Sequence, residues 1–334
     1  SLDSAGTTVA IGATNHQNDG HVRIFEWNGV AWVQKGMDID GLSNSDDFGI
    51  SVSLSADGNT VIIGDRNNFF GGPGRGAAHV FEWNGASWAQ KGGTIYGEFS
   101  GDNCGESVDI SYDGNIIVIG ARLNDGNGTS SGHIRIYEWD GNNWSQMGNG
   151  IDGESVGSDA GISSAISADG HTVALGGRRN DGGMGPGAEA GHARVYEWNG
   201  NTWVQKGADI DGESAGDRSG RRIDLSADGN YIVIGARWSA DSGTKAGHIR
   251  TFEWDGGSWV QLGADIDGVA AFDEFGEAVA INHNGSVICG TAHLNDGNGN
   301  NAGHARIYYG CPLRLTDQIT ACGDRKSTRL NSSH

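Results

Sequence analysis

The sequence of 334 residues contains only three prolines and four cysteines, and its 22 basic residues are outnumbered by 42 acidic ones. The resulting net charge of −20 would repel a phosphate backbone, which excludes nucleic acid as a partner. No apolar run approaches the roughly 20 residues of a membrane span, so no span is expected. The chain also lacks a helical period, a phosphate-binding loop, a nucleophile elbow and a metalloprotease motif. The sequence therefore predicts a protein without enzymatic activity.

Glycine and tryptophan are abundant, with 59 and 11 residues. The glycines fall at regular points between short apolar runs, which is typical of turns and not of a low-complexity chain. The many tryptophans also argue against disorder. The acidic balance favours a well-solvated surface and leaves cationic ligands, divalent metals and neutral sugars as partners.

An aromatic–Glu–Trp triplet marks an internal repeat. Successive copies start 56, 56, 59, 56 and 56 residues apart, and a period this constant does not arise from composition alone. The copies are Phe25-Glu26-Trp27, Phe81-Glu82-Trp83, Tyr137-Glu138-Trp139, Tyr196-Glu197-Trp198, Phe252-Glu253-Trp254 and a degraded Tyr308-Tyr309-Gly310. The chain therefore contains six imperfect repeats.

The second repeat shows the strand pattern of a unit. Residues 48–54 alternate between apolar and polar side chains, and residues 60–64 form a continuous apolar run, so both segments predict strands. Residues 79–83 and 87–91 flank Asn84-Gly85, a strong hairpin signal. Four short antiparallel strands per repeat predict an all-β fold, a β-propeller of six four-stranded blades.

Both ends of the repeat array are incomplete. Residues 1–6 align with the end of a first strand and its turn, so the first blade lacks its innermost strand. The last blade lacks its outer strand, because no Asn-Gly-x-x-Trp hairpin follows residue 309. We therefore expect a longer parent protein with seven blades.

The propeller is assigned to residues 1–310, and residues 311–323 to a truncated linker or the start of a further region. Within that region Cys311 and Cys322 are expected to form a disulfide. Residues 324–334, DRKSTRLNSSH, are similar to a translated sequencing adapter and are excluded from the fold.

The repeat resembles the FG-GAP repeat of integrin α-type propellers, in the form found in marine bacterial and algal surface proteins. The FG element corresponds to Phe48-Gly49 and Phe275-Gly276, and the GA element to Gly12-Ala13, Gly120-Ala121 and Gly235-Ala236. The resemblance covers residues 1–310 and implies an extracellular or cell-surface location with protein or glycan binding. Members of the family often carry a calcium loop between the first two strands. Here that loop is only Ser-Ala-Asp-Gly-Asn, a turn with one carboxylate.

These observations favour an extracellular binding or adhesion module without catalytic activity. One alternative is a propeller lectin with one sugar site per blade, because paired tryptophans at the hairpin tips, including Trp32 and Trp203, could stack on sugar rings. A second alternative is the non-catalytic part of a larger secreted enzyme. Packing within the hairpin is the simpler role for these tryptophans.

Acidic loops supply the candidate binding residues. The loops between second and third strands carry Asp125, Asp181 and Asp296, which with Trp32 and Trp203 are the predicted ligand-binding residues. The segments predicted to connect the blades carry the predicted metal ligands, which are Asp209, Asp211, Asp265 and Asp267. Both sets are expected on one acidic face, where a protein or carbohydrate partner would bind. Calcium is the expected ion, with weak affinity, because the donors are hard oxygens and no loop provides a full set.

A histidine is predicted to open the third strand of every blade. The six residues are His21, His79, His133, His192, His248 and His304. Six symmetry-related side chains on separate blades cannot share one metal ion away from the axis, so a structural role is expected.

Overall fold

A computed structural model of the protein describes residues 1–14, 19–41, 47–185 and 187–309. The described residues form strands and turns only. Accordingly, they contain no helix long and apolar enough to span a membrane. The predicted Cys311–Cys322 disulfide and the segment 324–334 lie outside the described residues.

Each repeat folds into one antiparallel sheet. The first strands are β5 (Phe48–Leu54), β10 (Cys104–Ile110), β15 (Ala160–Ile166), β20 (Arg222–Leu225) and β25 (Ala278–Ile281). The second strands are β1 (Thr8–Ala13), β6 (Thr60–Asp65), β11 (Ile116–Ala121), β16 (Thr172–Gly177), β21 (Tyr231–Ala236) and β26 (Val287–Ala292). The third strands are β2 (His21–Trp27), β7 (Ala77–Trp83), β12 (His133–Trp139), β17 (His192–Trp198), β22 (His248–Trp254) and β27 (His304–Tyr309).

The fourth strand of a blade is divided into two short pieces that both pair with the third strand. The first pieces are β3 (Trp32–Gln34), β8 (Trp88–Gln90), β13 (Trp144–Gln146), β18 (Trp203–Gln205) and β23 (Trp259–Gln261). The second pieces are β4 (Ile39–Asp40), β9 (Ile95–Tyr96), β14 (Ile151–Asp152), β19 (Ile210–Asp211) and β24 (Ile266–Asp267). The Asp-Ile-Asp segments were predicted to be connections between blades, and this is wrong, since their last two residues complete the fourth strand.

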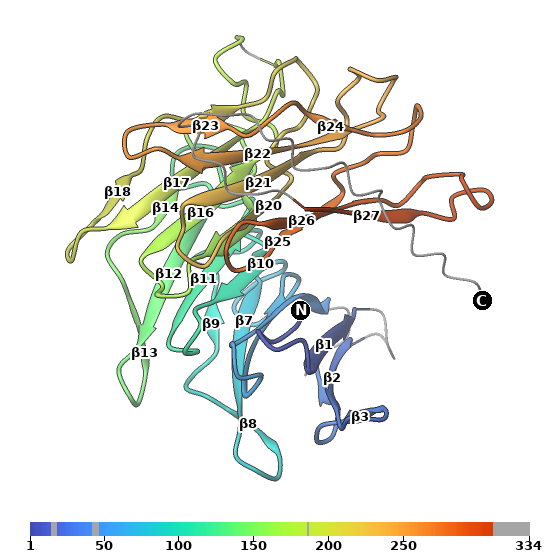
Figure 1. Ribbon diagram of the computed structural model, residues 1–334. Coiled ribbons are helices and arrows are strands. Elements are labelled where there is room, and N and C mark those ends of the chain that lie inside the picture. The colour runs from blue at the N-terminus through green and yellow to red at the C-terminus, as the bar shows by residue number, and fades with distance from the viewer. Residues whose placement is uncertain (15–18, 42–46, 186, 310–334) are drawn as a thin grey trace.

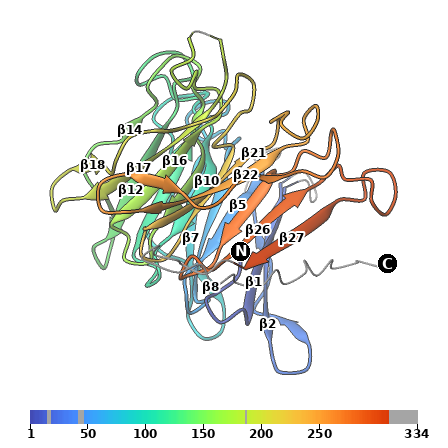
Figure 2. The ribbon, with the colours of Figure 1, turned by 45° about the horizontal axis from the view of Figure 1, so that its top comes forward.

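The blades surround a common axis. In Figure 1, β10, β20 and β25 lie at the centre, whereas the outer pieces β8, β13 and β18 lie at the periphery. Figure 2 shows the same arrangement from a second direction, with blade one (β1–β4) in blue and blade six (β25–β27) in orange to red. The predicted all-β propeller of six four-stranded repeats is therefore confirmed. In the described part of blade one an isolated bridge, Leu2 to Val9, stands where the other blades have a first strand.

The blades are joined near the axis at two levels. At one level, the GA glycine of each blade faces the FG glycine of the next: a Cβ added to Gly176 would lie 1.8 Å from the carbonyl oxygen of Gly220. At the other level, the tight turns after the first strands hydrogen-bond to one another through their backbones. These bonds run from Ser4 N–H to Ala56, Ala56 to Tyr112, Tyr112 to Ala168, Ala168 to Ala227 and Ala227 to His283. The inner strands are thus held in a rigid array that fixes the side chains pointing at the axis.

Candidate functional site

A constellation of charged side chains lies around the axis, at the ends of the second strands. Four blades place an arginine directly after the second strand, and blade six places a histidine there. First strands and the loops before them contribute carboxylates and two more arginines. We call this set the axial cluster; it comprises Arg66, Arg122, Arg178, Arg221, Arg222, Arg237, His293, Asp47, Glu106, Asp159, Glu274 and Glu277.

Ion pairs link the cluster from blade to blade. Glu106 of blade three lies 3.3 Å from Arg66 of blade two and 3.1 Å from Arg122 of its own blade. Glu277 of blade six lies 3.1 Å from Arg221 and 2.7 Å from Arg237, both in blade five. Because these side chains are only partly buried, the pairs leave guanidinium groups accessible at the end of the axis. The cluster therefore combines six arginines with five carboxylates, and five of the arginines are held in ion pairs.

Arg222 is the arginine of the cluster without an ion-pair partner among the described residues. Its Nη1 donates to the backbone carbonyls of Ile162 and Arg221, at 3.4 and 3.2 Å. Burial, reinforced by the neighbouring guanidinium of Arg221, lowers the pKa of Arg222. A partly buried guanidinium without a direct ion pair is costly, and a bound anion would relieve that cost.

Asp224 lies on the same face of β20 as Arg222, two residues further along the strand. The strand alternates, since Ile223 and Leu225 are buried in the blade while Arg222 and Asp224 keep some accessible surface. Two residues of an extended strand span about 6.6 Å, so the guanidinium and the carboxylate lie at successive depths along the axis.

Burial raises the pKa of Asp224 to about 7, although its carboxylate accepts hydrogen bonds from the backbone N–H groups of Ile281 and Leu225. Asp109, the corresponding residue of blade three, also has a raised pKa because of burial, and its charge contributes to the shift of Asp224. Asp109 accepts from Ser53 Oγ at 2.7 Å and from Ile166 N–H at 3.0 Å. A carboxyl group that titrates near neutrality is suited to proton transfer.

The raised pKa of Asp224 gives a stability prediction. The unfolded chain loses this proton near pH 4, whereas the native state keeps it to about pH 7. Asp224 therefore contributes less to stability as the pH rises from about 4 to about 7. Asp224→Asn removes this loss. The free energy of unfolding of the variant, relative to that of wild type, should therefore be about 2 to 4 kcal/mol higher at pH 8 than at pH 5. Urea denaturation at both pH values measures this change. Any effect of the asparagine on stability that does not depend on pH cancels when the values at pH 5 and pH 8 are subtracted.

Asp228→Asn is the matched control for this experiment. Asp228 lies in the turn that follows β20; burial opposes ionisation there, but hydrogen bonds from Ser226 and Asn230 hold its pKa below the ordinary value. Its titration is complete well below pH 5, so its effect on stability should not change between pH 5 and pH 8. An equally constant effect for Asp224→Asn would show that Asp224 titrates normally.

The predicted ligand-binding aspartates lie in the loops between second and third strands, where they accept hydrogen bonds from their own loops. Asp125 accepts the N–H of Ser130 at 2.7 Å, Asp296 that of Asn301 at 2.7 Å, and Asp181 that of Glu189 at 3.3 Å. These bonds close the loops. Ligand binding by the three aspartates stays a prediction.

The predicted metal-binding aspartates divide into two pairs. Asp209 lies with Glu154 and His192, and Asp265 with Glu213, Asp241 and His248, in groups whose ligand atoms are all within 4.8 Å of one another. The other two, Asp211 and Asp267, belong to neither group. The histidines in these groups were not among the predicted ligands, although their recurrence in the repeat was the available signal.

The strand register corrects the prediction that His79 is equivalent to the other five histidines. Ala77 pairs with Asp65 where the other blades pair a histidine with alanine or glycine, so His79 stands two residues later, at the position of Arg135. Arg135 donates to the carbonyl of Tyr96 in the preceding blade at 2.6 Å. The equivalent bonds join Arg194 to Asp152, Arg250 to Asp211 and Arg306 to Asp267.

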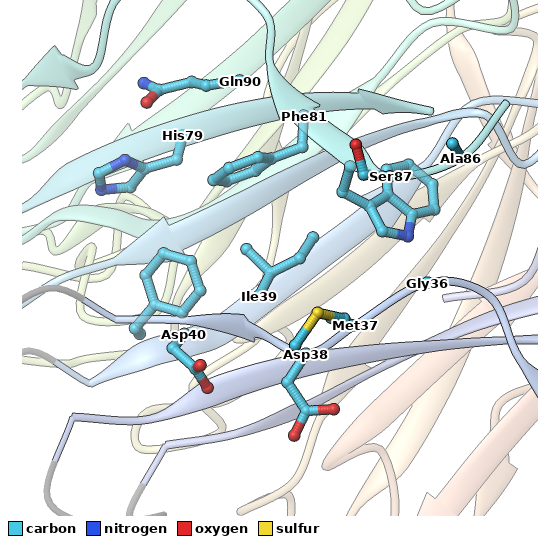
Figure 3. Close-up of a pocket in the computed structure, with 12 residues that line it drawn as sticks. Gly36, Met37, Asp38, Ile39, Asp40, His79, Phe81, Ala86, Ser87 and Gln90 are labelled. Atoms are coloured by element: carbon cyan, nitrogen blue, oxygen red, sulfur yellow. The ribbon is translucent and has the colours of Figure 1, made fainter. Parts of the chain in front are cut away.

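A groove of about 490 Å³ separates blades one and two where His79 replaces arginine. Figure 3 shows Met37 and Ile39 of blade one facing His79 and Phe81 of blade two across this groove. The imidazole is shorter than a guanidinium side chain and interacts with its own blade, through Asp65 at 3.4 Å and Thr94 at 3.2 Å. The groove is therefore the space that the arginine fills in blades three to six.

The fold has solved counterparts among bacterial enzymes. The periplasmic gluconolactonase of Pseudomonas aeruginosa superposes with a TM-score of 0.57 at 15% sequence identity, covering 92% of this chain and 79% of that one. The fold is similar to that of a lactonase. A protein of Bacteroides uniformis proposed to be a 6-phosphogluconolactonase gives a TM-score of 0.49 at 14% identity, covering 91% and 92% of the two chains. No family model matches the sequence, and no curated protein is similar to it.

These likenesses correct the expectations about function. The FG-GAP resemblance holds for the propeller fold, but the solved propeller that superposes on this chain is a gluconolactonase and not an integrin α-type propeller. The prediction of a non-enzymatic adhesion module, or of the non-catalytic part of an enzyme, is wrong, because the fold of this chain is one that a hydrolytic enzyme uses over almost all of the chain's length. The sequence could not show this, because the arginines and carboxylates of the axial cluster come from different repeats and carry no local motif.

Proposed function

We propose that the protein is a hydrolase of small lactones derived from sugar acids, with its active site in the axial cluster. The observation that carries the proposal is that two unusual side chains stand two residues apart on one strand. Arg222 is a guanidinium without an ion-pair partner among the described residues, and Asp224 is a carboxyl group whose pKa is about 7. Both side chains lie on one face of β20, opposite the buried Ile223 and Leu225. The likeness to a gluconolactonase supports the choice of reaction.

In the proposed reaction, Arg222 binds the carbonyl oxygen of the lactone and stabilises the oxyanion that forms on it. The Asp224 carboxylate takes a proton from a water molecule as that water attacks the carbonyl carbon. The bond from carbon to the ring oxygen then breaks, and Asp224 returns the proton to this oxygen, giving the open hydroxy acid. The remaining arginines of the axial cluster would hold the carboxylate of the product or a charged group on the substrate.

A gluconolactone hydrolysis assay, followed by acid release and corrected for spontaneous hydrolysis, tests the proposal. We expect Arg222→Gln and Asp224→Asn each to lower kcat/KM by at least 100-fold, because each removes a transition-state interaction. The wild-type rate should rise with pH up to about 7, as Asp224 ionises. Arg179→Gln is the control, since Arg179 is exposed and pairs with Glu189 outside the cluster. Activity that survives both axial substitutions, or is absent from wild type, would refute the assignment.

An extracytoplasmic location belongs to the same proposal. The similar P. aeruginosa enzyme is periplasmic. A net charge of −20 favours solubility without association with anionic surfaces.

A further inference from the structure

His192, the first residue of β17, has an environment that its hydrogen bonds do not explain. Its side chain has no exposed surface, and neither ring nitrogen has a hydrogen-bond partner. Nε2 lies against Gly177, where a Cβ would come within 2.7 Å of it. Nδ1 points instead between two carboxylates, 3.6 Å from Glu154 Oε2 and 3.6 Å from Asp209 Oδ2.

The two distances suit a shared cation better than a hydrogen bond. Hydrogen bonds between nitrogen and oxygen are about 2.7 to 3.2 Å long. Two ligands bound at about 2.0 to 2.1 Å to a tetrahedral ion lie about 3.4 Å apart. The three ligand atoms of His192, Glu154 and Asp209 also lie within 4.8 Å of one another, so a small movement would bring all of them onto one ion.

Neighbouring side chains orient both carboxylates. Gln205 donates to Oδ1 of Asp209 at 2.6 Å, which leaves Oδ2 for the position facing His192. Asn180 donates to Oε2 of Glu154 at 3.2 Å. Gln205 thus contacts the outer oxygen of its carboxylate, a regular feature of protein metal sites, whereas Asn180 donates to the oxygen of Glu154 that faces His192.

We propose that His192 Nδ1, Asp209 Oδ2 and Glu154 Oε2 bind a divalent transition-metal ion of the zinc type. A buried imidazole with two carboxylates is a donor set for zinc, whereas calcium needs six to eight oxygens. Glu154 follows the last strand of blade three, while His192 and Asp209 belong to blade four. The ion would therefore cross-link two adjacent blades and stabilise the propeller, at a site separate from the axial cluster.

The repeat provides internal comparisons for this site. Blade five has the same three residue types, with Asp241 added; these residues are His248, Asp265 and Glu213. In blade three, Gly150 stands where Asp209 stands in blade four, and His133 lies 3.7 Å from Asp152 instead. The group in blade five could bind a second ion, which is compatible with the proposal. A variant of the His192 group should therefore lose one equivalent of metal and not necessarily all of it.

Metal content and binding heat test the site independently of hydrolysis. Full-length protein is stripped with a chelator, dialysed and titrated with zinc chloride in a calorimeter, and bound zinc is measured by mass spectrometry. We expect His192→Asn to lose one equivalent of zinc, and Glu154→Gln, which alters an accessible side chain, to weaken that equivalent at least ten-fold. Zinc should raise the Tm of wild type more than that of either variant.

His283→Asn is the control, because His283 lies in a tight turn at the opposite face and contacts Tyr112. It should bind as much zinc as wild type. The proposal is overturned if wild type binds no zinc, if His192→Asn keeps every equivalent, or if calcium at equal concentration displaces the ion. Circular dichroism of each variant establishes that it is folded, and Glu154→Gln decides the outcome if His192→Asn does not fold.

Discussion

Gly176→Ala is expected to lower the free energy of unfolding by at least about 3 kcal/mol or to prevent folding. The added methyl group would lie 1.8 Å from the carbonyl oxygen of Gly220 and 2.6 Å from Ser163 Oγ. Neither atom can retreat easily, because Ser163 donates a hydrogen bond to that same carbonyl at 2.8 Å. The backbone of blade five would have to move away from blade four, which would open the packing between both blades.

Gly93→Ala is the matched control. Gly93 lies between the two pieces of the fourth strand of blade two, and nothing would come within 4 Å of its added Cβ. Its effect should stay within about 0.5 kcal/mol of wild type. Urea denaturation followed by tryptophan fluorescence gives both values. Similar stabilities for the two variants would mean that the blades can separate at the glycine pair without cost.

This glycine pair illustrates what the sequence could predict. The FG and GA glycines recur in the repeat, and the strand pattern around them is local, so the blades and their strand order follow from periodicity. That Gly176 and Gly220 face each other across two blades depends on the radial packing, which no single repeat contains. The same limit applies to the axial cluster, where Arg66 bonds to Glu106 of the next blade.

A signal for the axial cluster was nevertheless present in the aligned repeats. Arg66, Arg122, Arg178 and Arg237 each stand two residues after the second-strand glycine. Arg222 breaks the repeat instead, because the corresponding residues of blades three and four are Ser107 and Ser163, whereas Asp224 recurs as Asp109 in blade three. Only the structure shows that this departure and the repeated aspartate share one face of β20.

Trp203→Ala is expected to cost about 2 to 4 kcal/mol of stability. The indole N–H of Trp203 donates to the carbonyl of Met147 in the preceding blade at 2.8 Å, and the ring packs on the core that includes Met147. Removing the ring leaves a cavity between blades three and four and an unpaired carbonyl. The loss should appear as a lower midpoint in urea denaturation.

Trp32→Ala separates this blade contact from the hairpin contact. Trp32 pairs with Trp27 at 5.7 Å between ring centroids, much as Trp203 pairs with Trp198 at 5.2 Å. The side chain of Trp32 is 45% exposed, and its indole N–H has no hydrogen-bond partner in the part of the chain that the structure describes. The variant should lose only the cross-strand pair, worth roughly 0.2 to 1 kcal/mol. Because both substitutions break a tryptophan pair, the difference between them measures what one indole contributes to joining two blades, and equal losses would place that contribution near zero.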